Sequence, residues 1–239
     1  MTQPPLQIFV LGSDGNLWLE NGPFGQVPPP RVPVDGNVDL CKAFYALDQN
    51  TVYVCGSDGN LWLEYGPFGQ VPLPPCNGQS SSCRVQVDGS VAWFWPVNDY
   101  TGLEQILVLG QDGKLWLEYE PFGQVPPPRV QIDANVAAFG PGLWGGDISP
   151  TSGDVLVVGD DLNLWDEVGP FGQVPLPDCN GQSSSCRNRI DGNVIAFQPL
   201  WGESGEARFG ARKGQRPVVV PRGSAVRKGL RTSGLSPRK

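Results

Sequence analysis

The chain of 239 residues contains 32 glycines and 25 prolines and carries a net charge of −7. Eight tryptophans and ten phenylalanines exclude a wholly disordered chain, and the absence of any apolar run of about 18 residues excludes a transmembrane helix. Residues 1–206 hold all 24 acidic residues and only seven of the 17 basic ones, so this part of the chain repels nucleic acid and anionic membrane surfaces.

The N-terminal segment has no basic stretch followed by a long apolar one, so no signal peptide is predicted. The first predicted strand is the apolar run QIFVLG at residues 7–12. A Ser-Asp-Gly turn follows, and Asp-Gly between two apolar runs is a strong hairpin signal because glycine tolerates positive φ. The return strand is NLWLE at residues 16–20, whose leucines face one side and whose tryptophan and glutamate face the other. The proline-rich connector PFGQVPPP cannot lie inside a sheet, and RVPVD after it is the next strand.

This unit occurs four times. Later copies begin at the apolar runs TVYVCG, QILVLG and DVLVVG, which are apolar on both faces, so both faces are expected to be buried. The fourth copy reads DDLN where the others have an Asp-Gly turn, which predicts a different turn there. Copies two and four share an inserted CNGQSSSC loop.

About four short strands per unit, with no amphipathic helix, predict an all-β fold. Radial repetition of such sheets describes a β-propeller of four, or four to five, four-stranded blades. Residues 193–201, NVIAFQPLW, are expected to pair with residues 7–12 and close the ring. The two-residue link between RVQVD and NVAAF leaves open whether these are two strands or one bent segment. The propeller domain spans residues 1–206, and the basic residues 207–239 are predicted to be a disordered tail.

Six cysteines are present. Cys76 and Cys83 enclose the same short loop as Cys179 and Cys186, which favours two local disulfides or two pairs of free thiols over a metal site. Cys41 and Cys55 lie on adjacent predicted strands and form a third candidate pair. Paired cysteines favour an extracellular location, whereas the lack of a predicted signal peptide does not. The sequence therefore does not decide the cellular location.

The chain has no histidine, which removes Ser-His-Asp and Cys-His catalysis and the usual zinc chemistry. No phosphate-binding or calcium-binding motif is present, so neither a cofactor nor a metal is predicted. A glycosidase needs two unequal carboxylates in one cleft. Four equivalent glutamates distributed over a ring are the wrong arrangement, and we expect no enzymatic activity.

The Asp-Gly hairpin followed by NLWLE, a proline-containing loop and VDGNV before an apolar strand resembles small β-propeller lectins of the tachylectin-like and tectonin-like type. The resemblance covers residues 6–201. It implies sugar binding at equivalent sites between blades. The chain departs from these lectins in its PFGQVPPP connector and in showing four units where five or more are usual.

Four residue types recur at one position per unit and are the candidate ligand-binding residues. The tryptophans either stack on sugar rings or pack between blades. The arginines either bind ligand hydroxyls or carboxylates or pair with the repeated glutamates, and the glutamines lie in loops, where ligand contact is easiest. The candidates are Trp18, Trp62, Trp116, Trp165, Glu20, Glu64, Glu118, Glu167, Arg31, Arg84, Arg129, Arg187, Gln26, Gln70, Gln124 and Gln173.

The sequence thus predicts a multivalent, lectin-like repeat protein whose partners are glycans or glycoconjugates and whose acidic body binds no nucleic acid. Repetition would give each weak site avidity. The alternative is a protein-interaction scaffold, or a repeat fragment of a larger surface protein, because fold alone does not choose function.

Overall fold

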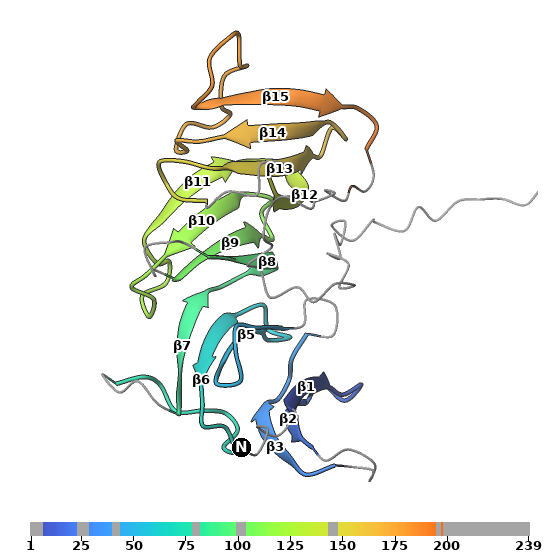
Figure 1. Cartoon of the computed structure of the whole chain (residues 1–239), viewed down its shortest axis with the longest axis vertical. Coiled ribbons are helices and arrows are strands. Elements are labelled where there is room, and N and C mark those ends of the chain that lie inside the picture. The colour runs from blue at the N-terminus through green and yellow to red at the C-terminus, as the bar shows by residue number, and fades with distance from the viewer. Residues whose placement is uncertain are drawn as a thin grey trace, which may run out of the picture.

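The computed structural model describes residues 7–22, 29–39, 44–77, 82–98, 104–142, 148–194 and 197. In these ranges the chain forms β-strands and no helix, which confirms the all-β class. The strands make four antiparallel sheets that follow one another along an arc in chain order (Figure 1). Within each sheet, strands that are consecutive in sequence are neighbours, as in a propeller blade.

The first sheet has three strands and the other three have four. The first two sheets consist of β1 (Gln7–Leu11), β2 (Leu17–Asn21) and β3 (Arg31–Asp35), then β4 (Phe44–Ala46), β5 (Thr51–Cys55), β6 (Leu61–Tyr65) and β7 (Cys83–Asp88). The third consists of β8 (Val91–Asn98), β9 (Glu104–Gly110), β10 (Leu115–Tyr119) and β11 (Arg129–Asp133). The fourth consists of β12 (Val136–Pro141), β13 (Asp154–Gly159), β14 (Leu164–Val168) and β15 (Cys186–Asp191).

The Asp-Gly turns close the hairpins as predicted. In the second sheet, Asp58 accepts hydrogen bonds from the backbone and side-chain amides of Asn60, at 2.9 and 2.7 Å, and Gly59 has a φ of 81°. The prediction of a different turn in the fourth unit is wrong. Leu162 takes the glycine position with a φ of 64°, and its amide donates to the carbonyl of Gly159 at 2.9 Å, as the glycine amides do. The Asp–Asn hydrogen bonds hold the turn even where a left-handed leucine is strained.

The link between units joins two separate strands. Two residues connect β7 to β8 and β11 to β12, which belong to different sheets. Ser90 and Asn135, the second residue of each link, have φ values of 56° and 57°. Short polar residues tolerate this left-handed conformation, and it turns the chain from one sheet into the next. The bent-segment alternative is therefore wrong.

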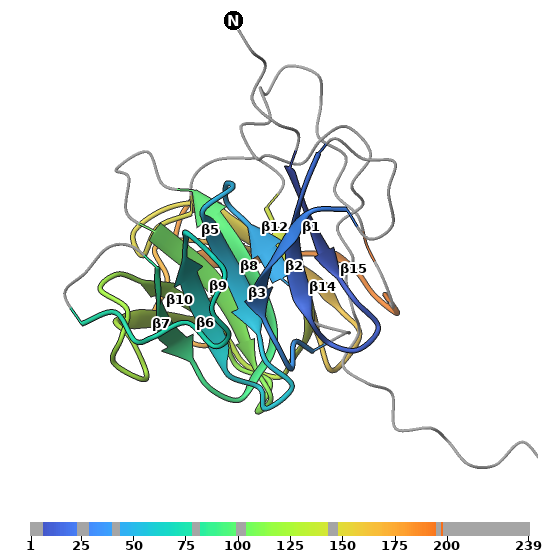
Figure 2. The ribbon, with the colours of Figure 1, turned by 90° about the horizontal axis from the view of Figure 1, so that it is seen from below.

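The core lies between the sheets, which pack face to face (Figure 2). Leu17, Leu19 and Val34 of the first sheet pack against Val52 and Val54 of the second. The other two interfaces repeat this pattern, with the leucines of one hairpin facing the β-branched residues of the next sheet. The strands β5 and β9 contribute side chains from both faces, to the interface with the sheet before and to the interface with the sheet after, which explains why their apolar runs are continuous.

The predicted closure of the ring is not seen. Among the described residues the sheets form an open arc, and β1 pairs only with β2. Of residues 193–201, only 193, 194 and 197 are described. Val194 and Phe197 pack against the outer face of the fourth sheet. The basic tail, residues 207–239, lies outside the described residues.

Candidate functional site

A tryptophan and an arginine stack on each other in all four units. The tryptophan lies on the second hairpin strand and the arginine on the strand that follows the connector. The guanidinium carbon is 4.1 Å from the indole ring centroid in every copy, which is cation–π distance. The pairs are Arg31 on Trp18, Arg84 on Trp62, Arg129 on Trp116 and Arg187 on Trp165. One face of each indole therefore holds the arginine, and the guanidinium is fixed in orientation.

The repeated glutamate lies opposite the arginine in strand register and is buried beneath it. Glu64, Glu118 and Glu167 are each 0% exposed. Burial, together with the negative charge of an aspartate on the preceding sheet, raises the pKa of Glu64 to about 8, of Glu118 to about 9 and of Glu167 to about 8. These carboxyl groups are therefore mostly protonated at neutral pH. The predicted arginine–glutamate pair is seen at Glu118, whose Oε1 lies 3.4 Å from Nη1 of Arg129.

The preceding sheet contributes an aspartate to each site. Asp35, Asp88 and Asp133 end the outermost strands of the first three sheets and are nearly buried. Nη1 of Arg129 lies 3.6 Å from Oδ2 of Asp88, across the boundary between two sheets. Burial raises the pKa of Asp35 and Asp133, and the arginines of the following sheet oppose that rise. The arginines of the second, third and fourth sheets thus each interact with a glutamate of their own sheet and with an aspartate of the sheet before.

Two pockets open at equivalent places, one between the first and second sheets and one between the third and fourth. Their volumes are about 290 and 390 Å³, near the small end of ligand pockets. The first is lined by Asp35, Gly36, Asn37, Gly56, Ser57, Asp58, Trp62, Val71, Pro72 and Arg84. The second is lined by Asp133, Ala134, Asn135, Gly159, Asp160, Asp161, Trp165, Val174, Pro175 and Arg187. The turn after one sheet and the hairpin, connector and arginine of the next build each pocket.

The chemistry of these pockets is polar and mildly acidic. Each contains one arginine, which donates hydrogen bonds, and at least two aspartates, which accept them. Asparagine adds both a donor and an acceptor, and the valine and proline of the connector add an apolar wall. Such a pocket can hold a small molecule that carries several hydroxyl groups and no negative charge.

The structure separates the predicted site residues into three groups. The tryptophans and arginines of the second and fourth sheets line the two pockets, whereas the glutamates are buried behind the arginines. Gln70, Gln124 and Gln173 are exposed in the connectors and are not among the described pocket-lining residues, and Gln26 lies outside the described residues. In the first sheet, Glu20 is only half-buried and Arg31 is exposed.

The pocket residues that come from the preceding sheet were not among the predicted site residues. Asp35 and Asn37 line the pocket of Trp62, although they belong to the unit before it. The signal was present, since the same turn, VDGN or a close variant, follows each unit. The sequence does not show that this turn packs beside the next hairpin and lines its pocket, which the structure does show.

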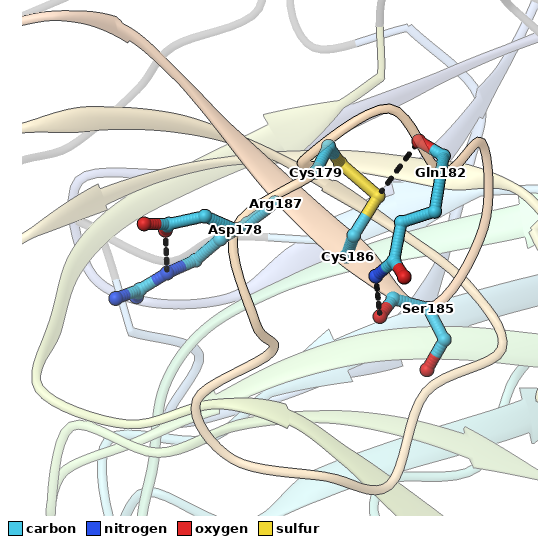
Figure 3. Close-up of a disulfide and its surroundings, with 6 residues drawn as sticks. All are labelled: Asp178, Cys179, Gln182, Ser185, Cys186 and Arg187. Carbon is cyan, nitrogen blue, oxygen red and sulfur yellow. Dashed lines mark hydrogen bonds and ion pairs between the residues drawn. A yellow bond between two sulfur atoms is a disulfide. The ribbon is translucent and has the colours of Figure 1, made fainter.

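The two predicted local disulfides are present, Cys76–Cys83 and Cys179–Cys186. Each fastens the end of a connector to the first residue of the outermost strand, and Figure 3 shows the bridge of the fourth sheet. The next residue on that strand is the site arginine. In the fourth sheet, Oδ1 of Asp178 lies 3.8 Å from Nε of Arg187. The disulfide thus borders the site. Cys55 is buried in β5, and Cys41 lies outside the described residues, so their pairing stays a prediction.

No group of three or more metal-ligating side chains occurs within the described ranges. In that part of the chain there is likewise no helix with the length and apolar character needed to cross a bilayer. No family model matches the chain, and no curated protein matches it significantly.

Proposed function

We propose that this chain is a multivalent carbohydrate-binding protein of the β-propeller type, without catalytic activity, and that its sugar sites are the pockets between adjacent sheets. The observation that carries the proposal is the recurrence of one pocket chemistry at two separate interfaces. The third interface carries the same residue types, with Arg129 stacked on Trp116 and facing Asp88. Repeated, equivalent sites serve avidity.

The lining favours a neutral or amino sugar over an acidic one. Asp35 and Asp58 outnumber the single cation, Arg84, in the first pocket. Aspartate oxygens accept hydrogen bonds from sugar hydroxyls, and the arginine donates to hydroxyl oxygens. A carboxylate on the ligand would meet two aspartates at close range, which is unfavourable.

The arrangement of acids supports binding rather than hydrolysis. A glycosidase places two carboxyl groups with different roles on either side of one bond. Here the glutamate with the raised pKa, Glu64 or Glu167, has no exposed surface and does not belong to the pocket lining. It supports the arginine from behind and does not contact a ligand in the pocket.

A monosaccharide screen read by thermal shift tests the proposal, because a ligand that binds the native state raises its melting temperature. Neutral hexoses, amino sugars and acidic sugars form the three arms, and a rise in the neutral or amino arm is expected. The double variant Arg84→Ala/Arg187→Ala should weaken binding at the two described pockets by about 10- to 100-fold, since hydrogen bonds to a charged group contribute about 1.5–3 kcal/mol.

Lys114→Ala is the matched control for the loss of a positive charge. Lys114 is exposed in the third-sheet hairpin and pairs with the exposed Asp112 at 2.9 Å. Neither residue lines the two described pockets, so removal of the lysine should leave sugar binding there unchanged. A folded wild-type protein without any sugar response would overturn the proposal. Capture of a protein partner that free sugars do not displace would favour the interaction-scaffold alternative.

A further inference from the structure

The two ends of the arc expose residues that are buried at every internal interface. Ile8 on β1 is 40% exposed, whereas its equivalents in the next three sheets, Val52, Ile106 and Val155, are 0% exposed. Ile190 on β15 is 44% exposed, whereas its equivalents in the first three sheets, Val34, Val87 and Ile132, are also 0% exposed. Compared with the equivalent residues at the internal interfaces, Ile8 and Ile190 therefore remain largely uncovered by the described part of the chain.

The exposed residues on the two ends occupy the positions that form the two sides of each internal interface. Val34 packs against Val52 and Val54, and the same positions meet at the other two interfaces. By equivalence, Ile190 on the fourth sheet is the counterpart of Ile8 on the first. Val194 and Phe197 already cover part of the fourth sheet, in the places that Val136 and Phe139 take against the third.

The charged residues at the two ends are complementary as well. At the third-sheet site, Arg129 faces Asp88 of the preceding sheet at 3.6 Å. The corresponding residues at the free ends are Arg31 on the first sheet and Asp191 on the fourth, and both are exposed. A fourth-sheet face would thus offer an aspartate to the arginine of a first-sheet face.

We propose that the fourth sheet of one copy docks onto the first sheet of a second copy, head to tail, in the way that sheets join within the chain. The fourth sheet differs from the others at one residue pair, since Asp166 and Asn188 replace a leucine and a valine. The arc holds its own first and fourth sheets at opposite ends (Figure 1), so the matching face comes from another molecule. The contact is heterologous, with a different surface on each partner. Three copies of this interface already exist inside the molecule, and the fourth continues their series.

This docking would complete a further pocket, and the inference that this pocket binds sugar rests on the proposed function. Asp191 and Asn193 of one copy would join Asp14, Trp18 and Arg31 of the next, in the arrangement that lines the two described pockets. Assembly would therefore add sugar sites that neither copy holds alone.

The mass of the full chain in sugar-free buffer tests the docking separately from sugar binding. Light scattering after size exclusion, from low to high micromolar protein, should give a mass above that of one chain, which is 25.7 kDa. Ile8→Glu and Ile190→Glu should each give monomers, because every head-to-tail contact needs both faces. Both side chains are substantially exposed in a single copy, so neither substitution buries a charge within the fold.

Mixing the two variants tests directly whether the fourth-sheet face of one chain binds the first-sheet face of another. The Ile8→Glu chain keeps its fourth-sheet face and the Ile190→Glu chain keeps its first-sheet face, so the mixture should form a 1:1 complex of two chains. Val125→Glu, at a position 49% exposed on the connector of the third sheet, is the control and should assemble like the wild type. A monomeric wild type at all concentrations, or variants that fail to complement, would overturn the proposal.

Discussion

Replacing the buried glutamate behind an arginine is expected to stabilise the protein, whereas loss of a residue in a salt bridge ordinarily destabilises it. Glu64 lies opposite Arg84 in register, yet its carboxyl oxygens have no hydrogen-bond partner among the described residues. Its pKa is raised to about 8, mainly by burial. We therefore expect Glu64→Gln, which keeps the shape and removes the ionisable group, to stabilise the protein at neutral pH.

The magnitude follows from proton linkage. Between the ordinary glutamate pKa and about 8, the unfolded chain releases a proton that the folded chain keeps, so stability falls as pH rises. At pH 7 the difference amounts to about 3 kcal/mol. The glutamine amide lacks partners as well, at a cost of about 1 kcal/mol. A net gain of about 2 kcal/mol remains, which corresponds to a rise of roughly 4–8 °C in melting temperature for a domain of this size.

Thermal melts of wild type and Glu64→Gln at a series of pH values from 4.5 to 8 measure this effect. The gain should be near zero or slightly negative at the acidic end and should grow with pH. Glu167→Gln, whose pKa is also raised to about 8, should behave in the same way. If the variant instead loses stability, and loses more as pH rises, then Glu64 is ionised and paired with Arg84, and the reasoning is refuted.

Two further substitutions test the turn and the disulfide. Leu162→Gly should stabilise the fold by about 1 kcal/mol in urea denaturation, because a left-handed leucine is strained; a loss would mean that the leucine side chain makes contacts worth more than the strain. Cys76→Ala/Cys83→Ala, which opens a short loop of sequence separation 7, should lower the free energy of unfolding by about 2.5 kcal/mol. An unchanged urea midpoint under oxidising conditions would count against a structural role for that bridge.

Local chemistry made much of the fold predictable. Asp58 and Gly59 define a hairpin by short-range hydrogen bonding, and the apolar runs reveal strands covered on both faces. The prediction for the turn at Leu162 is wrong because the hydrogen bonds between Asp161 and Asn163 keep the turn geometry although the glycine is lost. Turn geometry depends on all the residues that hold it.

The site was only half predictable, because its geometry depends on longer-range features. The arginine reaches the tryptophan ring across a strand pair with an irregular register between Leu61 and Trp62, and a β-bulge of this kind leaves no clear mark in the sequence. Asp35 reaches the same pocket from another sheet. Side chains distant in sequence meet here only because of how the sheets pack.

Each pocket straddles the boundary between two units, and this affects how the molecule would respond to its ligand. A molecule bound there touches both neighbours at once, so it would act as a clamp that resists their separation. In a linear array held together by nearest-neighbour contacts, ligands bound in this way stabilise the interfaces between units rather than the individual units. Occupancy would therefore make unfolding more cooperative along the chain.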